Sequence, residues 1–312
     1  MTQRNDLAAR LLQAVGQVLL GKTEAVELAV TTLFAGGHLL IEDHPGVGKT
    51  LLARSLARAL DLPFQRIQCT ADLLPSDVVG SQVYDPRSGE VRFRPGPVFT
   101  SVLLADELNR MPPRTQSALL ECMAEHKVTV DRETHDLPEP FFVVATQNPN
   151  SSAGTYLLPD NQLDRFLVRL RLGHPDAEHE ARALALDDGH RRSHDVKPVA
   201  RREELLQTMR AVDGIAASEE IARWIVELAN RTRRSAEVAL GVSTRGAQAL
   251  HRAARARALV NGRDYVVPDD VLALVAPVWA HRITLRNAGS SAGAGAAEAV
   301  LAEIVAAVAT PD

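Results

Sequence analysis

Residues 44–50, His-Pro-Gly-Val-Gly-Lys-Thr, have the composition and spacing of a loop that binds phosphate groups. Glycines let successive backbone N–H groups turn toward an anion, and a following helix adds its positive N-terminal end. Lys49 is expected to reach the β- and γ-phosphates of a nucleotide, and the Thr50 hydroxyl to bind Mg²⁺. Asp43 stands where the usual pattern has its first glycine, and its carboxylate is expected to point away from the phosphates. The alternative is a Gly/Pro turn that binds no ligand.

Two adjacent carboxylates, Asp106 and Glu107, follow an apolar run at residues 102–105. At the carboxyl edge of a parallel sheet, Asp106 would hold Mg²⁺ and Glu107 would polarise an attacking water. Asn148 follows another apolar run, and at the same edge its amide would orient that water. Each of these polar groups alone is also compatible with a solvated turn. Their positions on later strands than the phosphate loop favour a site that acts on nucleotide phosphates.

Short β-rich runs alternate with helical patterns as far as about residue 172, and these elements must position the candidate residues. Strands are predicted at residues 38–41, 64–68, 102–105, 141–145 and 167–170, and helices at 50–60 and 112–125. Such alternation predicts a mostly parallel sheet with helices on both faces. The polar residues that follow the strands would then meet at one edge of the sheet.

The pattern changes after residue 175, where amphipathic helical patterns follow one another and no strand is predicted. Helices are expected at residues 177–186, 201–212, 218–232, 243–260 and 269–275, with Ser218 and Ser243 as N-caps. Arg252, Arg255 and Arg257 are expected to cover the outer face of one helix. The chain is therefore divided into an α/β nucleotide-binding domain, residues 1–174, and an all-helical lid domain, residues 175–312.

The composition agrees with two globular domains, since 312 residues correspond to two units of roughly 150 residues each. Lys and Arg number 35 against 39 Asp and Glu, for a net charge of −4, which disfavours a nucleic-acid binder held by bulk charge. Two cysteines are too few for a disulfide framework, and we expect no leader and no membrane-spanning run. The expected compartment is the cytoplasm.

Six segments in order resemble the MoxR family of AAA+ ATPases. They are residues 41–50, 72–80, 105–110, 112–121, 145–149 and 158–166, and the likeness extends from about Gly21 to about Val275. The resemblance implies a P-loop parallel sheet flanked by helices and followed by a helical lid, with ATP and Mg²⁺ as cofactors. It implies that the nucleotide is contacted by Gly21, Lys22, Pro45, Gly46, Val47, Gly48, Lys49, Thr50 and Leu51.

The same resemblance implies catalytic and metal-binding roles. The catalytic residues would be Glu107, Asn148, Arg165 and Arg245, and the metal-binding residues Thr50 and Asp106. Arg165 would serve the nucleotide of a neighbouring subunit, where a guanidinium stabilises the transferred phosphoryl group. Arg245 would be a second sensor that contacts the nucleotide of its own chain, although Thr244 stands where the family usually has proline. Without the resemblance, a surface ion pair is the simpler interpretation of either arginine.

Two further segments, near residues 81–95 and 127–140, predict hairpins inserted in the α/β domain. Their positions resemble the insertions of one AAA+ clade. Arg87, Arg92 and Arg94, in or beside the first hairpin, would either contact a partner in a central pore or face the solvent. The sequence leaves both alternatives open.

In function, the resemblance implies a homo-oligomer, expected as a hexameric ring. ATP hydrolysis to ADP and phosphate would drive chaperone-like remodelling, maturation or cofactor insertion in a client protein complex. A partner with a von Willebrand factor A domain is also implied. The alternatives are a chelatase-type motor subunit and an ATP-gated scaffold with little hydrolysis, and the presence of Glu107 disfavours the scaffold. The even charge balance disfavours a DNA-remodelling motor.

Overall fold

The computed structural model describes residues 6–87, 89–148, 154–156, 158–185, 196–286 and 295–311. A five-stranded parallel sheet forms the centre of the first domain, with the strand order β2-β5-β8-β1-β9. Its strands are β1 (Leu39–Glu42), β2 (Phe64–Gln68), β5 (Val102–Asp106), β8 (Phe142–Gln147) and β9 (Val168–Leu170). The predicted parallel sheet is confirmed.

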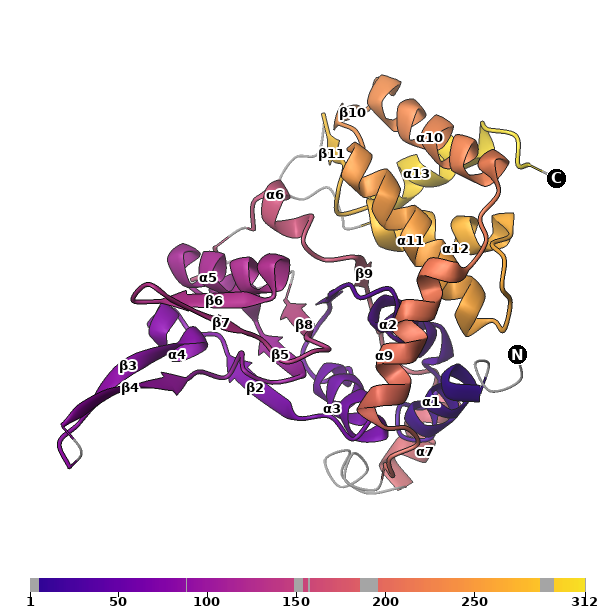
Figure 1. The fold of residues 1–312 in the computed structure, drawn as a ribbon. Coiled ribbons are helices and arrows are strands. Elements are labelled where there is room, and N and C mark those ends of the chain that lie inside the picture. The colour runs from indigo at the N-terminus through magenta and orange to yellow at the C-terminus, as the bar shows by residue number, and fades with distance from the viewer. Residues whose placement is uncertain are drawn as a thin grey trace.

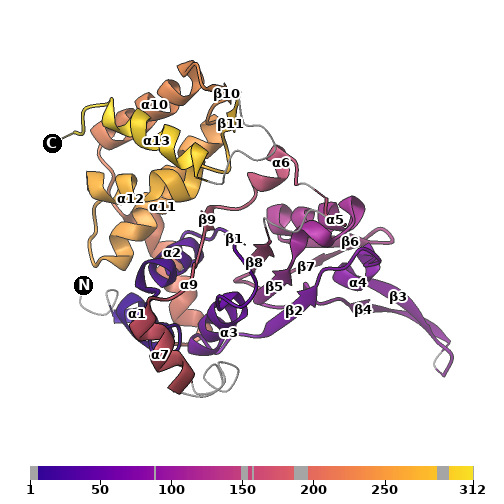
Figure 2. The ribbon, with the colours of Figure 1, turned by 180° about the vertical axis from the view of Figure 1, so that it is seen from behind.

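Helices cover both faces of this sheet, as Figure 1 and Figure 2 show. Because successive strand residues point to opposite faces, Leu39 and Ile41 belong to one apolar cluster and Leu40 to the other. Residues of α1, α2 and α3 join the first cluster, and residues of α4 and α5 join the second. The helices of this domain are α1 (Asp6–Gly16), α2 (Thr23–Phe34), α3 (Lys49–Ala59), α4 (Pro75–Val79), α5 (Pro113–Glu125) and α6 (Asp160–Leu163).

Two antiparallel hairpins extend the domain at the end farthest from the lid. One is formed by β3 (Gly80–Asp85) and β4 (Glu90–Pro95), and the other by β6 (Lys127–Val130) and β7 (Glu133–Asp136). The β3–β4 hairpin projects from the body of the molecule (Figure 1). The Phe93 ring stacks on the His135 ring, with centroids 4.1 Å apart, so the two hairpins support each other at their bases.

The second half of the chain is mainly helical. It contains α7 (Ala177–Ala185), α9 (Arg202–Ala211), α10 (Glu219–Arg234), α11 (Thr244–Val260), α12 (Pro268–Trp279) and α13 (Ala296–Ala306). The Ser218 hydroxyl accepts from the Ile221 N–H and the Ser243 hydroxyl from the Gly246 N–H, so both expected N-caps are present. Contrary to the expectation of no strand, β10 (Val238–Leu240) and β11 (Thr284–Leu285) form a short antiparallel pair.

Helix α11 joins the two halves of the molecule by packing on α2. Arg257 forms an ion pair with Glu27 of α2 at 3.0 Å, and both side chains are largely buried. Arg252 donates to the Ala35 carbonyl and pairs with Asp213. The expectation of an outer face is therefore wrong for Arg257, which the helix turns toward the first domain, whereas Arg252 is partly exposed. Within the described part of the chain, no helix has the length and apolar character required to cross a membrane.

Candidate active site

The phosphate loop connects the carboxyl end of β1 to the first turn of α3. Gly46 and Gly48 have φ angles of 88° and 100°, a region that side chains other than glycine rarely adopt. Gly48 is the N-cap of α3, so the first backbone N–H groups of the helix open toward the loop. Beside them is a cavity of about 540 Å³, lined by Pro45, Gly46, Gly48, Lys49, Thr50, Leu51, Arg54, Arg66, Gln68, Asp106 and Glu107.

Two residues of the expected loop face away from this cavity. Val47 is buried in the apolar core with α3, so its contribution to the loop is its backbone. The Asp43 carboxylate points away, as expected, and accepts from the backbone N–H groups of Leu172, Gly173 and His44. Burial opposes ionisation of Asp43, but these hydrogen bonds outweigh it and hold the pKa of the carboxyl below its usual value. Asp43 thus anchors the loop to the segment after β9.

Lys49 lies at the mouth of the loop with Asp106 and Glu107 nearby. Its Nζ donates to the Asp43 carbonyl. Burial lowers the pKa of Lys49, whereas Asp106, Asp43 and Glu107 oppose that shift. A triphosphate would supply the negative charge that a half-buried ammonium group requires.

Thr146, near the end of β8, fixes the carboxylate pair. Its hydroxyl donates to Asp106 Oδ1 at 2.6 Å and accepts from the Glu107 N–H at 2.9 Å. Glu107 has a φ of 59°, in the left-handed region where a residue other than glycine is strained. Because Thr146 is fully buried on the strand beside β5, it holds Glu107 in this conformation. Sequence reasoning missed Thr146.

Arg66 of β2 is a second residue that sequence reasoning missed. Its guanidinium donates to Asp106 Oδ2 at 2.6 Å and to Gln68 Oε1 at 2.8 Å. Arg66 and Gln68 lie two positions apart on the strand next to β5, so both line the cavity while Ile67 is buried. The sequence did contain a signal for Arg66 and Gln68. In the strand predicted before the Asp-Glu pair, these two polar side chains alternate with an apolar one, so both point to the same face.

Asn148 directly follows β8, where the register pairs Glu42 with Gln147 and Ile41 with Thr146. It therefore lies at the carboxyl edge of the sheet, level with the phosphate loop and one position beyond Gln147. It is not among the residues that line the cavity. The structure thus brings Asn148 to the expected edge of the sheet.

The loop that contains Gly21 and Lys22 also lies near the phosphate loop. A Cβ atom on Gly48 would come within 3.0 Å of Leu19 Cδ1, so the two loops are in contact. Gly21 and Lys22 themselves line a neighbouring cavity of about 400 Å³, between α2, β9 and α12. Gly21 and Lys22, which the resemblance places at the nucleotide, are therefore adjacent to the phosphate cavity but outside it.

Arg165 and Arg245 belong to segments that meet at the amino ends of the strands, opposite the carboxyl ends that carry the phosphate loop. The N–H of Leu167 donates to the carbonyl of His38, which precedes β1, whereas the phosphate loop follows the end of that strand. At about 3.3 Å per residue, the strand separates the two edges by about 13 Å, more than an arginine side chain can span. Arg165 follows α6, and Figure 1 and Figure 2 show α6 and α3 at opposite ends of the sheet.

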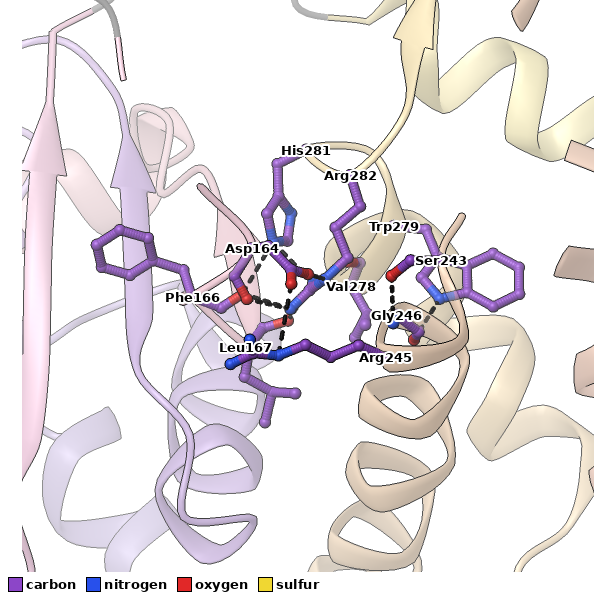
Figure 3. Close-up of polar contacts among 10 residues, drawn as sticks. All are labelled: Asp164, Phe166, Leu167, Ser243, Arg245, Gly246, Val278, Trp279, His281 and Arg282. Atoms are coloured by element: carbon purple, nitrogen blue, oxygen red, sulfur yellow. Dashed lines mark hydrogen bonds and ion pairs between the residues drawn. The ribbon is translucent and has the colours of Figure 1, made fainter. Parts of the chain in front are cut away.

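Arg245, at the start of α11, points toward the segment that contains Arg165. Its Nε lies 3.4 Å from Asp164 Oδ2 (Figure 3). The side chain is 61% exposed, and among the described residues the lid contributes nothing to the lining of the phosphate cavity. In this arrangement the Arg245 side chain does not line the phosphate cavity, and its contact with a nucleotide stays a prediction.

The residues of the cavity fit a magnesium nucleotide. Thr50 and Asp106 both line it, and hydroxyl and carboxylate oxygens are ligands that suit Mg²⁺. In the described residues, no three His, Cys, Asp or Glu side chains gather as a complete metal site. An incomplete set of protein ligands is expected where phosphate oxygens and water complete the coordination of Mg²⁺. Arg66, already paired with Asp106, is the group with which a cation would compete.

A P-loop at the edge of a five-stranded parallel sheet, a carboxylate pair on a neighbouring strand and a helical lid define a nucleotide-binding protein of the AAA+ class. Residues 38–168 match the family described as "ATPase family associated with various cellular activities (AAA)". Residues 230–304 match the "AAA lid domain". The chain is 34% identical to a proposed ATPase of Cytophaga hutchinsonii, whose crystal structure superposes with a TM-score of 0.91 over 100% of this chain and 97% of that one.

Three relatives narrow this class. The chain is 44% identical to the uncharacterized protein YeaC of Bacillus subtilis, over 98% of this chain and 96% of the relative. It is 36% identical to chaperone MoxR1 of Mycobacterium tuberculosis, over 88% and 75% respectively. It is 34% identical to protein MoxR of Paracoccus denitrificans, over 88% of each chain. The chain belongs to the MoxR family of AAA+ ATPases.

Proposed function

We propose that this protein hydrolyses ATP to ADP and phosphate in the cavity beside the phosphate loop. The observation that carries the proposal is the meeting of four residues in one cavity, although they come from α3 and from the end of β5 with the residue after it: Lys49, Thr50, Asp106 and Glu107. Lys49 and the backbone N–H groups of the loop would hold the phosphates. Glu107, fixed by Thr146, would accept a proton from the attacking water, and Asn148 would orient that water.

Thr50 and Asp106 are the residues that would hold Mg²⁺. The cation would neutralise charge on the β- and γ-phosphates. Arg66 would keep the charge of Asp106 compensated when no nucleotide is bound, since its guanidinium already donates to that carboxylate.

We further propose that the active form is a ring, with a hexamer as the expected size. The position of Arg165 supports this, because it lies too far from its own phosphate loop to act there. Among the described residues, the Arg165 side chain has no hydrogen-bond or ion-pair partner. Arg245 lies beside Arg165, so both cations would face the nucleotide of a neighbouring copy rather than their own. In a cyclic assembly each copy presents one edge to the loop of the next.

The work done by hydrolysis is proposed to be chaperone-like remodelling of a client protein complex. One relative is named a chaperone, and the projecting β3–β4 hairpin offers a surface away from the ATP cavity. On the family resemblance, we propose a partner with a von Willebrand factor A domain. Cys69 and Cys122 are both free and buried, which agrees with a reducing compartment such as the cytoplasm. A chelatase-type motor subunit remains the second candidate, since it would use the same cavity.

Glu107→Gln tests the proposed hydrolysis. The variant should bind a fluorescent ATP analogue with wild-type affinity, because Lys49 and the loop remain. It should lose at least about 100-fold in turnover, because the amide cannot accept the proton. Lys49→Ala should lose binding as well, and Glu121→Gln, an exposed carboxylate on α5, should retain both properties. Wild-type turnover in Glu107→Gln would contradict the role assigned to this residue.

A further inference from the structure

Arg282 is a buried arginine that links the lid to the α/β domain, and the proposed reaction does not account for it. It lies between α12 and β11, and its side chain is only 4% exposed. Burying a guanidinium is costly unless each of its five N–H groups finds an acceptor. Figure 3 shows that the side chain reaches the segment 164–167, which follows α6.

Every N–H group of Arg282 has such an acceptor. Nε donates to Asp164 Oδ1 at 2.8 Å, and Nη2 donates to the carbonyls of Phe166 at 2.7 Å and Asp164 at 3.3 Å. Nη1 donates to the Leu167 carbonyl at 3.1 Å and to the Val278 carbonyl. All but the Val278 carbonyl belong to the segment 164–167, so this arginine binds that segment more than it binds the lid.

His281 adds to the same attachment. Its Nε2 lies 2.9 Å from the Phe166 carbonyl, and the ring is fully buried. Burial and the neighbouring Arg282 lower the pKa of His281 well below its usual value, so the ring is neutral. Nε2 also lies 2.8 Å from Arg282 Nη1. The neutral ring holds one of these two contacts as a hydrogen bond, because Nε2 either accepts from Nη1 or donates to the Phe166 carbonyl.

The segment that is held in this way contains Arg165. Its two neighbours, Asp164 and Phe166, accept from Arg282 through a carboxylate and through backbone carbonyls, so the lid is hydrogen-bonded to the chain on both sides of Arg165. The second oxygen of Asp164 lies beside Arg245, which adds a further lid residue to the same carboxylate. The structure therefore ties one edge of the sheet to the position of α11 and α12.

We propose that Arg282 is a positioning residue for Arg165, through which the lid of one copy sets the arginine offered to the nucleotide of the next copy. The proposal rests on the proposed action of Arg165 at a neighbouring site. Arg282 lies at the edge opposite its own phosphate loop, so its loss should leave the affinity of that loop for ATP unchanged. A displacement of about 1 Å at a reacting group can cost about 100-fold in rate, and we expect a loss of about 10- to 100-fold in turnover.

Arg282→Gln is the primary variant, and Asp164→Asn breaks the same contact from the other side in case the first variant does not fold. Arg263→Gln is the matched control, because Arg263 also forms a bidentate pair with a buried carboxylate of the lid, Asp270, but does not touch the segment 164–167. This control should retain wild-type turnover. Folding and assembly of each variant are verified by circular dichroism and size-exclusion chromatography.

The decisive measurement is ATP turnover in mixed assemblies. A chain with Arg282→Gln has an intact loop, and a Lys49→Ala chain has an intact Arg165, so mixing the two should restore activity at about a quarter of the interfaces. Mixing Arg282→Gln with Arg165→Ala should restore none, because both defects lie on the same face. A mixture of Arg165→Ala with Lys49→Ala reports on the proposed function itself.

The outcomes separate the two claims. Recovery with Lys49→Ala but not with Arg165→Ala supports the positioning role. Failure of Arg282→Gln to recover with Lys49→Ala, while Arg165→Ala does recover, overturns the positioning role and leaves the proposed function intact. Recovery of Arg282→Gln with Arg165→Ala also overturns it, because the defects would then lie on different faces. If Arg165→Ala fails to recover with Lys49→Ala, action between copies is wrong, and the role of Arg282 falls with it.

Discussion

The ion pair between Arg66 and Asp106 gives the phosphate cavity a property that neither residue has alone. Asp106 is the expected ligand of Mg²⁺, yet in this structure a guanidinium donates to one of its oxygens and Thr146 to the other. The Arg66 side chain is 44% exposed, so the pair contributes at most about 1 kcal/mol to stability. Its importance lies in what it would do when a cation arrives at Asp106.

Arg66→Gln should tighten the binding of Mg²⁺ and slow the reaction. Removing the competing charge should lower the Mg²⁺ concentration at half-saturation by about two- to fivefold, in line with an exposed ion pair worth up to about 1 kcal/mol. Turnover should fall, because a cation that faces the phosphates is lost. The measurement is a Mg²⁺ titration of the binding of a fluorescent ATP analogue, with the exposed Arg114→Gln as control. An unchanged or higher Mg²⁺ concentration at half-saturation would contradict this account of Arg66.

The sequence predicted the candidate site residues that stand in a local motif. It missed those that join the site only because of the order of strands in the sheet. The phosphate loop and the pair of Asp106 with Glu107 follow apolar runs with a recognisable spacing. Arg66 and Thr146 become site residues only because β2 and β8 flank β5, and no local pattern specifies that order. The nucleotide-binding, metal-binding and catalytic roles of all the candidate site residues remain predictions.

At the scale of elements, His38 shows how the sheet is fixed to its covering helix. Its Nε2 lies 3.1 Å from the Met123 carbonyl of α5, and its Nδ1 accepts from the Val143 N–H of β8 at 3.1 Å. Burial lowers its pKa to about 4, the Met123 hydrogen bond opposes this, and the nearby His126 adds to it. The unfolded chain therefore binds a proton that the folded chain excludes between about pH 6.5 and pH 4.

This excluded proton makes stability fall as the pH falls through that window. Between about pH 7.5 and pH 5.5, His38 alone should lower the free energy of unfolding by about 1 kcal/mol. His38→Gln retains a donor and an acceptor but cannot take up the proton, so its free energy of unfolding should decrease less over the same interval. Urea unfolding at the two pH values measures the difference. The same pH dependence in both proteins would contradict the buried neutral state of His38.

Helices and strands whose apolar residues gather on one side were predicted well. Elements without such an apolar side were missed. The predicted strand at 64–68 and the helix at 243–260 differ from β2 and α11 by at most one residue. Helix α2 is apolar on nearly all sides because it lies between the sheet and α11, so it has no periodic polar face. Strands β10 and β11 are too short for a pattern and pair across about 45 residues of chain.

At the scale of the whole molecule, the two edges of the sheet have different tasks. The carboxyl edge holds the phosphate loop and the carboxylates, and the opposite edge holds Arg165 beside the lid. Arg257 and Arg282 fix the lid to the helices and to that second edge. Figure 2 shows α10–α13 of the lid away from α3, whose first turn lines the phosphate cavity. This arrangement agrees with the proposal that a neighbouring copy completes the site.

Mixing two nearly inactive variants tests this central claim most directly. Arg165→Ala should assemble and bind ATP yet lose about 1,000-fold in turnover, the order expected for a missing arginine finger. Lys49→Ala should be inactive because it cannot hold the phosphates. In verified mixed assemblies, a Lys49→Ala chain offers its Arg165 to the intact loop of an Arg165→Ala neighbour, so turnover should rise to about a quarter of the wild-type value. Turnover that remains at the level of the separate variants would contradict an active site shared between copies.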